Sequence, residues 1–216
     1  MSRPTIVPLG DGALTVTWPG PLTPETHRLV RTAALRVRSA RLPAVRDLVP
    51  AYTTLSIFYD LLVTDYATIA RQIEGVIVIN EGDAGAKLLP GREHRISVVY
   101  DGPDLADVAR DTGLSVAEVI ARHTGRWYDV YLVGFVPGWA YLGELDASLF
   151  LPRRAAPRQR VPAGAVAIAG AQTGIYPFAT PGGWHLIGRT GVTMFDPARE
   201  PPALFQVGDR VRFEAA

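Results

Sequence analysis

Residues 152–190 read PRRAAPRQRVPAGAVAIAGAQTGIYPFATPGGWHLIGRT, and this stretch decides how the second half of the chain folds. Glycine and proline recur every few residues, a pattern typical of short strands joined by tightly specified turns. The segments 165–169 and 184–188 predict two of these strands, and we interpret Gln172 to Gly174 as a polar turn between them. Many short strands separated by such turns favour a β-barrel or a β-sandwich.

Most of the polar groups able to recognise a ligand lie in the same stretch. Arg158 and Arg189 can each grip a carboxylate or a phosphate with two parallel N–H groups. Gln172 and Thr173 can hydrogen-bond an amide, such as a lactam or a ureido group. His185 can transfer a proton near neutral pH.

These residue types predict one wall of a binding or catalytic site. We assign catalytic roles to His185 and Gln172. Structural roles remain open for both, because His185 alternates with apolar neighbours on a predicted strand and Gln172 could fasten a loop. Arg153 and Arg154 are interpreted as surface or subunit-interface charges. Substrate binding is assigned to five residues, of which the two tyrosines would wall the pocket: Arg158, Thr173, Arg189, Tyr141 and Tyr176.

The first 90 residues predict a small α+β sandwich, because strand and helix patterns alternate along them. Thr23 can cap a helix that begins at Pro24 and runs towards Ser39. Thr64 can cap a second helix, which Gly75 would end. The expected strands are 6–9, 13–18, 45–49 and 55–59.

Loop-forming residues at 80–85 and 90–91 predict a boundary, giving an N-terminal domain of residues 1–90 and a C-terminal domain of residues 91–216. Two short helices are expected in the C-terminal part, 104–111 and 116–123, and Ser115 with Glu118 forms a capping box for the second. Further strands are expected at 94–100, 127–133, 192–195 and 210–213.

The pair of short helices also resembles the helix-turn-helix of DNA-binding proteins. We favour a helical hairpin packed on a sheet, because acidic side chains on the pair would oppose phosphate. The net charge of +1 likewise gives no electrostatic footprint for nucleic acid or an anionic membrane. The acidic residues are Asp104, Asp107, Asp111 and Glu118.

Composition excludes several kinds of chemistry. The 216 residues contain no cysteine, so disulfides, cysteine nucleophiles and thiolate metal sites are excluded. The histidines at 27, 94, 123 and 185 lack metal-ligand spacing, so we expect no metal. The single lysine, Lys87, lies outside any phosphate-binding loop motif. No apolar leader or run of membrane-spanning length occurs, so we expect a cytoplasmic protein.

Four longer motifs resemble a known protein family. The chain is similar, from Leu9 to Phe213, to the family that contains the B-type chain of bacterial 5-oxoprolinase, subunit 1 of allophanate hydrolase and the Kip-type inhibitor of a sporulation histidine kinase, and to carboxyltransferase subdomains C and D. Trp139 stands where this family usually has phenylalanine. The motifs are GDGAL, VVYDGPDLADVARDTGLSVAEVIARHT, GFVPGWAYLG and PRQRVPAGAVAIAGAQTGIYPFATPGGWHLIGRT.

The resemblance implies a fold and a choice of functions. The implied fold is α+β, with an N-terminal α+β sandwich domain followed by a cyclophilin-like β-barrel. The leading function is that of a non-autonomous subunit of an ATP-dependent hydrolase that opens 5-oxoproline to glutamate, working with a homologous-family partner of the C type or subunit 2 type and with a third subunit. ATP is used by the complex, and no cofactor site is evident in this chain. The alternatives are an inhibitor that binds a sensor histidine kinase and a subunit of an allophanate hydrolase.

Overall fold

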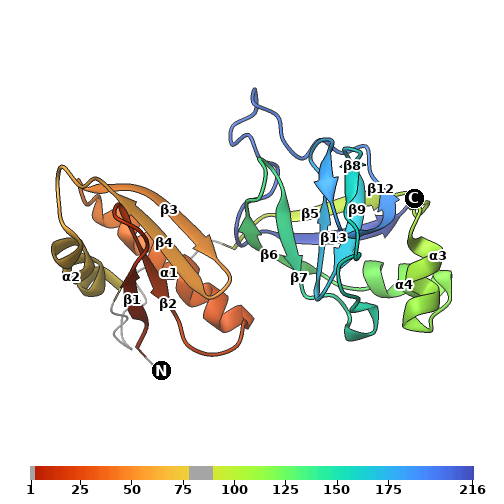
Figure 1. Ribbon diagram of the computed structural model, residues 1–216, viewed down its shortest axis with the longest axis horizontal. Helices are drawn as coiled ribbons and strands as arrows, with labels where there is room; N and C mark the ends of the chain where they lie inside the picture. The colour runs from red at the N-terminus through yellow and green to blue at the C-terminus, as the bar shows by residue number, and fades with distance from the viewer. Residues whose placement is uncertain (1–2, 78–89) are drawn as a thin grey trace. The chain divides into compact units, whose positions relative to one another are not determined.

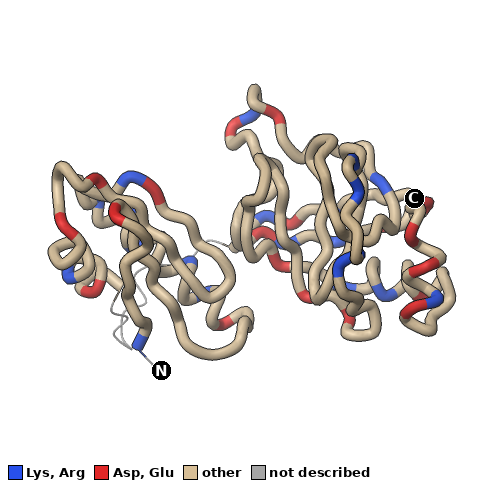
Figure 2. Tube along the Cα trace, in the orientation of Figure 1, with Lys and Arg blue, Asp and Glu red and all other residues tan. Residues whose placement is uncertain are grey.

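The computed structural model describes residues 3–77 and 90–216 (Figure 1). The expected loop at 80–85 and Lys87 lie outside these residues. Contacts between residues divide the chain into two compact units, Met1–Pro90 and Gly91–Ala216, and each has its own hydrophobic core. Acidic and basic residues are interspersed along both units, as the near-neutral net charge requires (Figure 2).

The first unit is a four-stranded antiparallel sheet backed by two helices (Figure 1). Its strands run in the order β1-β2-β4-β3. Apolar side chains of β2 and β4 pack against the buried faces of the helices, which completes a two-layer α+β sandwich. The elements are β1 (Thr5–Pro8), β2 (Ala13–Thr17), α1 (Pro24–Ala40), β3 (Val45–Ala51), β4 (Thr54–Tyr59) and α2 (Tyr66–Ile77).

Helix caps explain where the two helices of the first unit begin. Thr23 accepts a hydrogen bond from the backbone N–H of Thr26, which confirms the predicted start of α1. For α2 the prediction of Thr64 as the cap was wrong, because the carboxylate of Asp65 accepts from the N–H of Thr68. The helix also continues through Gly75.

The continuation of α2 past Gly75 has a packing cause. Ile69, Ile73 and Ile77 recur every four residues and are buried on one face of the helix. Burial of three isoleucines contributes more than the ~1 kcal/mol by which an internal glycine destabilises a helix. The apolar stripe therefore decides the end of this helix.

The second unit is built on a seven-stranded sheet in the order β12-β9-β10-β7-β6-β13-β5. Val99, just after β5, and Arg189 of β12 exchange two backbone hydrogen bonds of 2.9 Å, so the outer strands meet and the sheet is nearly closed. β13 pairs in parallel with β5 and antiparallel with β6. The strands are β5 (Glu93–Val98), β6 (Tyr128–Val133), β7 (Ala140–Gly143), β9 (Ala165–Ala169), β10 (Gln172–Ile175), β12 (His185–Arg189) and β13 (Arg210–Ala215).

The remaining elements of this unit cover the barrel-like sheet. α3 (Leu105–Thr112) and α4 (Val116–Thr124) lie side by side and bury apolar residues in the core that all seven strands share (Figure 1). The capping box of Ser115 and Glu118 is present as predicted. β8 (Arg158–Val161) and β11 (Thr180–Gly182) form a separate two-stranded sheet, and η1 (Ala147–Leu149) is a short 3-10 helix. The predicted α+β fold class is confirmed.

Two local predictions in this unit were wrong. Gln172 to Gly174 is not a turn but part of β10, which pairs with both β9 and β7. The chain reverses two residues earlier, at Gly170, whose φ of +55° suits glycine. Residues 192–195 form no strand, since only Phe195 makes an isolated bridge, to Ala203. β7, β8 and β11 had not been anticipated.

β9 is buried on both of its faces. Val166 and Ile168 point into the core shared with α3 and α4. Ala165, Ala167 and Ala169 point to the other face, where they pack with large aromatic side chains. Because side chains alternate along a strand, the small residues gather on one face and leave room for the aromatic rings. This aromatic face carries much of the candidate site.

Candidate functional site

Asp104 is the centre of a charged cluster in the second unit. Its side chain is only 2% exposed. The Oδ1 atom accepts hydrogen bonds of 2.7 Å from both Arg154 Nη1 and Arg158 Nη2, while Oδ2 accepts one of 2.7 Å from the backbone N–H of Leu186. One carboxylate therefore joins the start of α3 to β8, to β12 and to the segment before β8.

The electrostatics of Asp104 follow from these contacts. Burial by itself raises the pKa of this carboxyl group, because a buried charge loses its hydration. The hydrogen bond from Arg158, the one from the Leu186 N–H and the charges of both arginines act in the other direction and outweigh burial. The pKa of Asp104 is therefore lowered, and the residue is an anion at neutral pH.

The sequence pattern did not identify Asp104 as a site residue. It precedes α3 in the usual position of a capping residue, yet its side chain makes no cap hydrogen bond with its own helix. The carboxylate turns instead towards arginines that lie about fifty residues further along the chain. Arg154, interpreted as a surface or interface charge, is a half-buried partner of this cluster.

Some guanidinium N–H groups of this cluster have no acceptor. Within the described part of the chain, Arg154 Nε and Arg158 Nη1 are buried and have no hydrogen-bond partner. Two guanidinium charges also face a single carboxylate, so the cluster keeps a surplus positive charge. Unsatisfied buried donors are uncommon in proteins and are a typical feature of a ligand site.

Four aromatic rings form a wall beside this cluster. Trp139 lies 4.6 Å from Tyr176 and 5.0 Å from Trp184, measured between ring centroids, and Tyr141 lies 5.7 Å from Trp139 and 6.0 Å from Trp184. The angles between the rings favour edge-to-face attraction. In the described residues the indole N–H of Trp139 is buried without a hydrogen-bond partner. We call these four residues the aromatic wall.

Tyr176 connects the aromatic wall to the arginines. Burial raises the pKa of its phenol, and a backbone hydrogen bond with Trp184 and the positive charges of Arg153 and Arg158 reduce this effect. A Cβ atom at Gly182 would lie 2.1 Å from the hydroxyl oxygen of Tyr176. Only glycine therefore allows the backbone of β11 to lie against this ring.

The register of the sheet places the two predicted catalytic residues on opposite faces. Gln172 lies opposite Ala169 and Gly143, so it shares a face with the aromatic wall. His185 lies opposite Ile168, whose side chain belongs to the other face. The Nε2 atom of His185 is 2.8 Å from the carbonyl oxygen of Pro152, and its Nδ1 atom has no hydrogen-bond partner in the described residues.

Thr173 lies inside the core of the barrel. Its side chain is fully buried, and its hydroxyl donates to the carbonyl of Ala167 at 3.0 Å. The same hydroxyl accepts from His123 Nε2 at 2.9 Å, while His123 Nδ1 accepts from the Tyr100 hydroxyl at 2.6 Å. Burial lowers the pKa of His123 to about 3, so this imidazole is neutral. The hydroxyl of Thr173 is thus engaged in the core network.

Arg189 lies apart from the other arginines. Its Nε atom donates to Asp101 at 2.9 Å, and both side chains are largely exposed. It occupies the opposite end of β12 from His185. The structure therefore brings together Arg158, Tyr141 and Tyr176 of the predicted site, and it adds Asp104, Arg154, Trp139 and Trp184.

Acidic side chains and histidines are scattered over the described residues rather than grouped. Within 3–77 and 90–216 no group of three or more histidine, aspartate or glutamate side chains could hold a metal ion. None of the helices in the described residues is long and apolar enough to cross a membrane.

Comparison with known proteins places the chain in a family. Residues 4–205 match the family described as carboxyltransferase domain, subdomain C and D. The chain is 34% identical over 226 residues to the B-type chain of 5-oxoprolinase from Bacillus subtilis (strain 168), covering 98% of this chain and 92% of that protein. It is 37% identical over 211 residues to the B-type chain of 5-oxoprolinase from Haemophilus influenzae (strain ATCC 51907 / DSM 11121 / KW20 / Rd), covering 96% of each.

A solved structure shows the same relationship. The crystal structure of TTHA0988 is 39% identical with a TM-score of 0.84, covering 95% of this chain and 40% of that chain. This chain therefore spans about two fifths of the length of TTHA0988. The resemblance that the sequence motifs indicated is confirmed, and the chain belongs to the carboxyltransferase domain, subdomain C and D family, as a relative of the B-type chain of 5-oxoprolinase.

Proposed function

We propose that this chain is a non-autonomous subunit of an ATP-dependent 5-oxoprolinase-type hydrolase, which opens the cyclic amide of 5-oxoproline to give glutamate. Relatives named as the B-type subunit of 5-oxoprolinase, similar over nearly the whole chain, support this function. The word subunit in their names supports a complex with other chains. The proposed partners are a chain of the C type or subunit 2 type and a third subunit, and ATP is used by the complex.

The chemistry of the substrate fits the cluster beside Asp104. 5-Oxoproline is a small five-membered lactam that carries a carboxylate, so its site needs a cation, a group that hydrogen-bonds an amide and an apolar wall. Arg158 supplies the cation, Gln172 the amide-binding group and Tyr141 with Tyr176 the wall. The observation that carries the proposal is the pair of buried guanidinium N–H groups without a partner next to the aromatic wall.

The register of the sheet divides the proposed catalytic residues. Gln172 shares a face with the aromatic wall, and His185 lies on the opposite face of the sheet. One small substrate cannot contact side chains on both faces, so we assign Gln172 to the substrate site. A catalytic role for His185 is tested separately by His185→Gln, which keeps a side-chain donor for the Pro152 carbonyl. Thr173 and Arg189 are left out of the proposed site because of their positions.

The decisive experiment measures ATP hydrolysis that depends on 5-oxoproline. The chain is assayed alone and with the products of the neighbouring genes, and glutamate formation is followed by chromatography. We expect activity only in the combination, because a chain that supplies one wall of a site needs its partners. Allophanate replaces 5-oxoproline in a parallel assay.

Each outcome of this assay has a clear meaning. Full activity of the chain alone would show that it is autonomous, and turnover of allophanate in place of 5-oxoproline would overturn the substrate. If no combination is active with 5-oxoproline although all chains are folded, the proposed function is wrong.

A further inference from the structure

Arg154, Arg158 and Asp104 together have the construction of an anion-binding site, and we call them the arginine seat. Both guanidinium groups lie within hydrogen-bonding distance of a single oxygen, Asp104 Oδ1, so they are held close together. Two positive charges against one negative charge leave the seat electropositive. Like charges held side by side repel one another, and an additional anion relieves that repulsion.

The donors of the arginine seat are fixed but incompletely used. The backbone N–H of Leu186 holds the second oxygen of Asp104, so the carboxylate cannot turn freely. Each arginine gives one N–H to Asp104, and within the described residues Arg154 Nε and Arg158 Nη1 remain buried without an acceptor. Held by a fixed carboxylate, these N–H groups are preorganised for a second acceptor.

The surroundings of the seat select the size and character of the ligand. Tyr176 feels the charge of Arg158 and contacts Trp139 of the aromatic wall. Gly182 lies against the Tyr176 hydroxyl without a side chain of its own. A ligand bound at the seat would therefore present an oxyanion to the arginines and a flat apolar body to the rings.

We propose that the arginine seat binds the carboxylate of a small cyclic amide, with Arg154 and Arg158 as binding residues and Asp104 as the positioning residue that holds them. This inference rests on the proposed function and deepens it, because it assigns the carboxylate of 5-oxoproline to these two arginines. A planar carboxylate matches the fork of a guanidinium, and the rings lie next to it for the lactam.

The first test measures binding to the full chain by isothermal titration calorimetry. The probes are 5-oxo-L-proline, 2-pyrrolidinone, which has the same ring without the carboxylate, glutarate, which has carboxylates without the ring, and inorganic phosphate. We expect 5-oxo-L-proline to bind at least tenfold more tightly than each of the other probes. The loss of a charge-assisted hydrogen-bonded pair weakens binding by about tenfold to a hundredfold.

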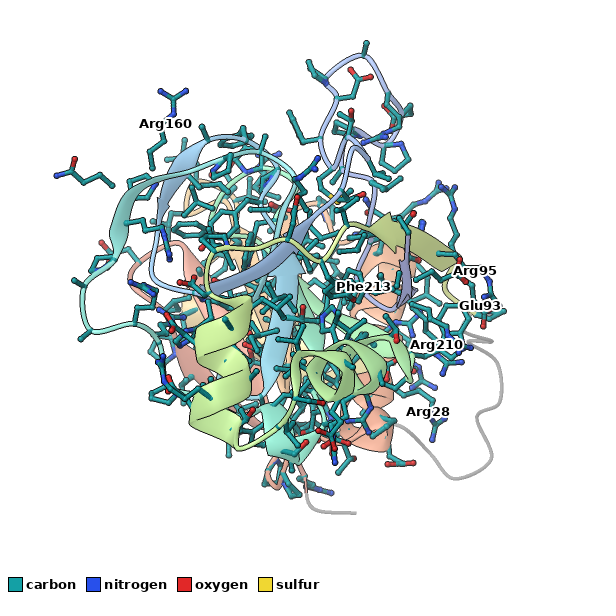
Figure 3. All side chains as sticks on the ribbon, turned by 90° about the vertical axis from the view of Figure 1, so that its right-hand side faces the viewer. Arg28, Glu93, Arg95, Arg160, Arg210 and Phe213 are labelled. Atoms are coloured by element: carbon teal, nitrogen blue, oxygen red, sulfur yellow. The ribbon has the colours of Figure 1, made fainter. Side chains whose placement is uncertain are left out.

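The second test uses variants of the seat with a matched control. Arg154→Gln and Arg158→Gln should each weaken 5-oxo-L-proline binding by about tenfold to a hundredfold. Arg160→Gln is the control, because Arg160 lies on the same strand as Arg158, is exposed, and projects away from the body of the molecule in Figure 3. Its affinity should stay within about twofold of the parent chain. Arg158→Lys keeps the charge without the fork and should be intermediate.

Folding of each variant is checked by thermal unfolding, so a loss of affinity is read only from folded protein. If 5-oxo-L-proline binds the glutamine variants as tightly as the parent chain, the arginine seat is not its site, while the proposed function stands. If glutarate binds as tightly as 5-oxo-L-proline and both need the arginines, the seat is a carboxylate site and the lactam substrate is wrong. Tighter binding of phosphate, or no binding of any carboxylate to the folded chain, overturns the inference.

Discussion

His123 shows how burial sets the state of a single side chain. Its imidazole is fully buried, stacks on Phe213 at 4.4 Å between ring centroids and hydrogen-bonds Tyr100 and Thr173. Thr173 donates to a carbonyl and so accepts from Nε2–H, which leaves Nδ1 to accept from the tyrosine hydroxyl. Every polar atom of the ring is satisfied only when the ring is neutral.

This network predicts that the second unit loses stability as the pH falls. Burial lowers the pKa of His123 from 6.5 to about 3. The unfolded chain therefore takes up a proton below pH 6.5 while the native state does not, so stability present above pH 6.5 is lost as the pH falls towards 3. The contribution of this one residue falls by up to about 1.4 kcal/mol per pH unit.

The matched variant is His123→Phe, which keeps an aromatic ring against Phe213. At pH 8 it should be less stable by about 1–3 kcal/mol, because the Tyr100 hydroxyl loses its acceptor. Urea unfolding of both proteins at several values between pH 8 and pH 4 gives the difference, and the other histidines, common to both, cancel. A difference that stays constant with pH would contradict the lowered pKa.

The sequence predicted site residues only where one residue type suffices to suggest a role. Arg158 lay in a stretch rich in recognition groups, and the structure does place it beside unpartnered donors and aromatic rings. Asp104 could not be identified, because its partners come from two later segments and from the backbone of Leu186. Long-range pairings of this kind leave no local pattern in a sequence.

At the scale of elements, the aromatic wall depends on glycine in the strand opposite to it. A Cβ atom at Gly174 of β10 would lie 2.9 Å from the Trp139 ring and 3.0 Å from the carbonyl oxygen of Ala140. β10 and β7 can therefore hold Trp139 in its position only if residue 174 has no side chain. The strand was missed in the sequence for the same reason, since Gln172, Thr173 and Gly174 show turn residues where a ring needs space.

Gly174→Ala is expected to displace Trp139 and loosen the aromatic wall. Overpacking in a well-packed region typically costs about 1–3 kcal/mol. Gly191→Ala is the control, because a Cβ atom there meets nothing within 4 Å and the backbone has no positive φ. Urea unfolding and tryptophan fluorescence should report a less stable protein and a changed indole environment for Gly174→Ala alone. An equal response of the two variants would mean that Trp139 can adjust without cost.

Helices were predicted better than strands because their signals are local. Thr23 before Pro24 and Ser115 before Glu118 each mark a helix start within a few residues of sequence, and both caps are present. The strands β7, β8 and β11 have three or four residues each and depend on partners elsewhere in the chain. The barrel itself followed from the family resemblance, which carries information about such pairings.

At the scale of the whole molecule, the chain has separate cores that share no residue. One is built from residues of the first unit, and the cores of the second unit are built from residues between Ile96 and Phe213. The start of the second unit is anchored by the N–H of Arg92, which donates to Asp209 at 2.8 Å. The predicted domains, 1–90 and 91–216, stay a prediction about independent folding.

We expect residues 91–216 to fold alone, because the cut leaves their cores and the Arg92 contact intact. Circular dichroism and urea unfolding should show one cooperative transition. Residues 99–216 are the matched control, because they lack β5, the parallel neighbour of β13, and should unfold at much lower urea. Absence of a cooperative transition for residues 91–216 would show that the second unit needs the first.

The position of β13 has a consequence for biosynthesis. It is the last described strand in the chain, yet it lies between β6 and β5 in the sheet. On the ribosome, Glu93–Val98 leaves the exit tunnel long before its parallel partner, Arg210–Ala215, has been translated. The nascent barrel therefore keeps two strands without their shared neighbour until translation reaches that segment. Slow codons late in the message would lengthen the time during which chaperones or other nascent chains can reach these strands.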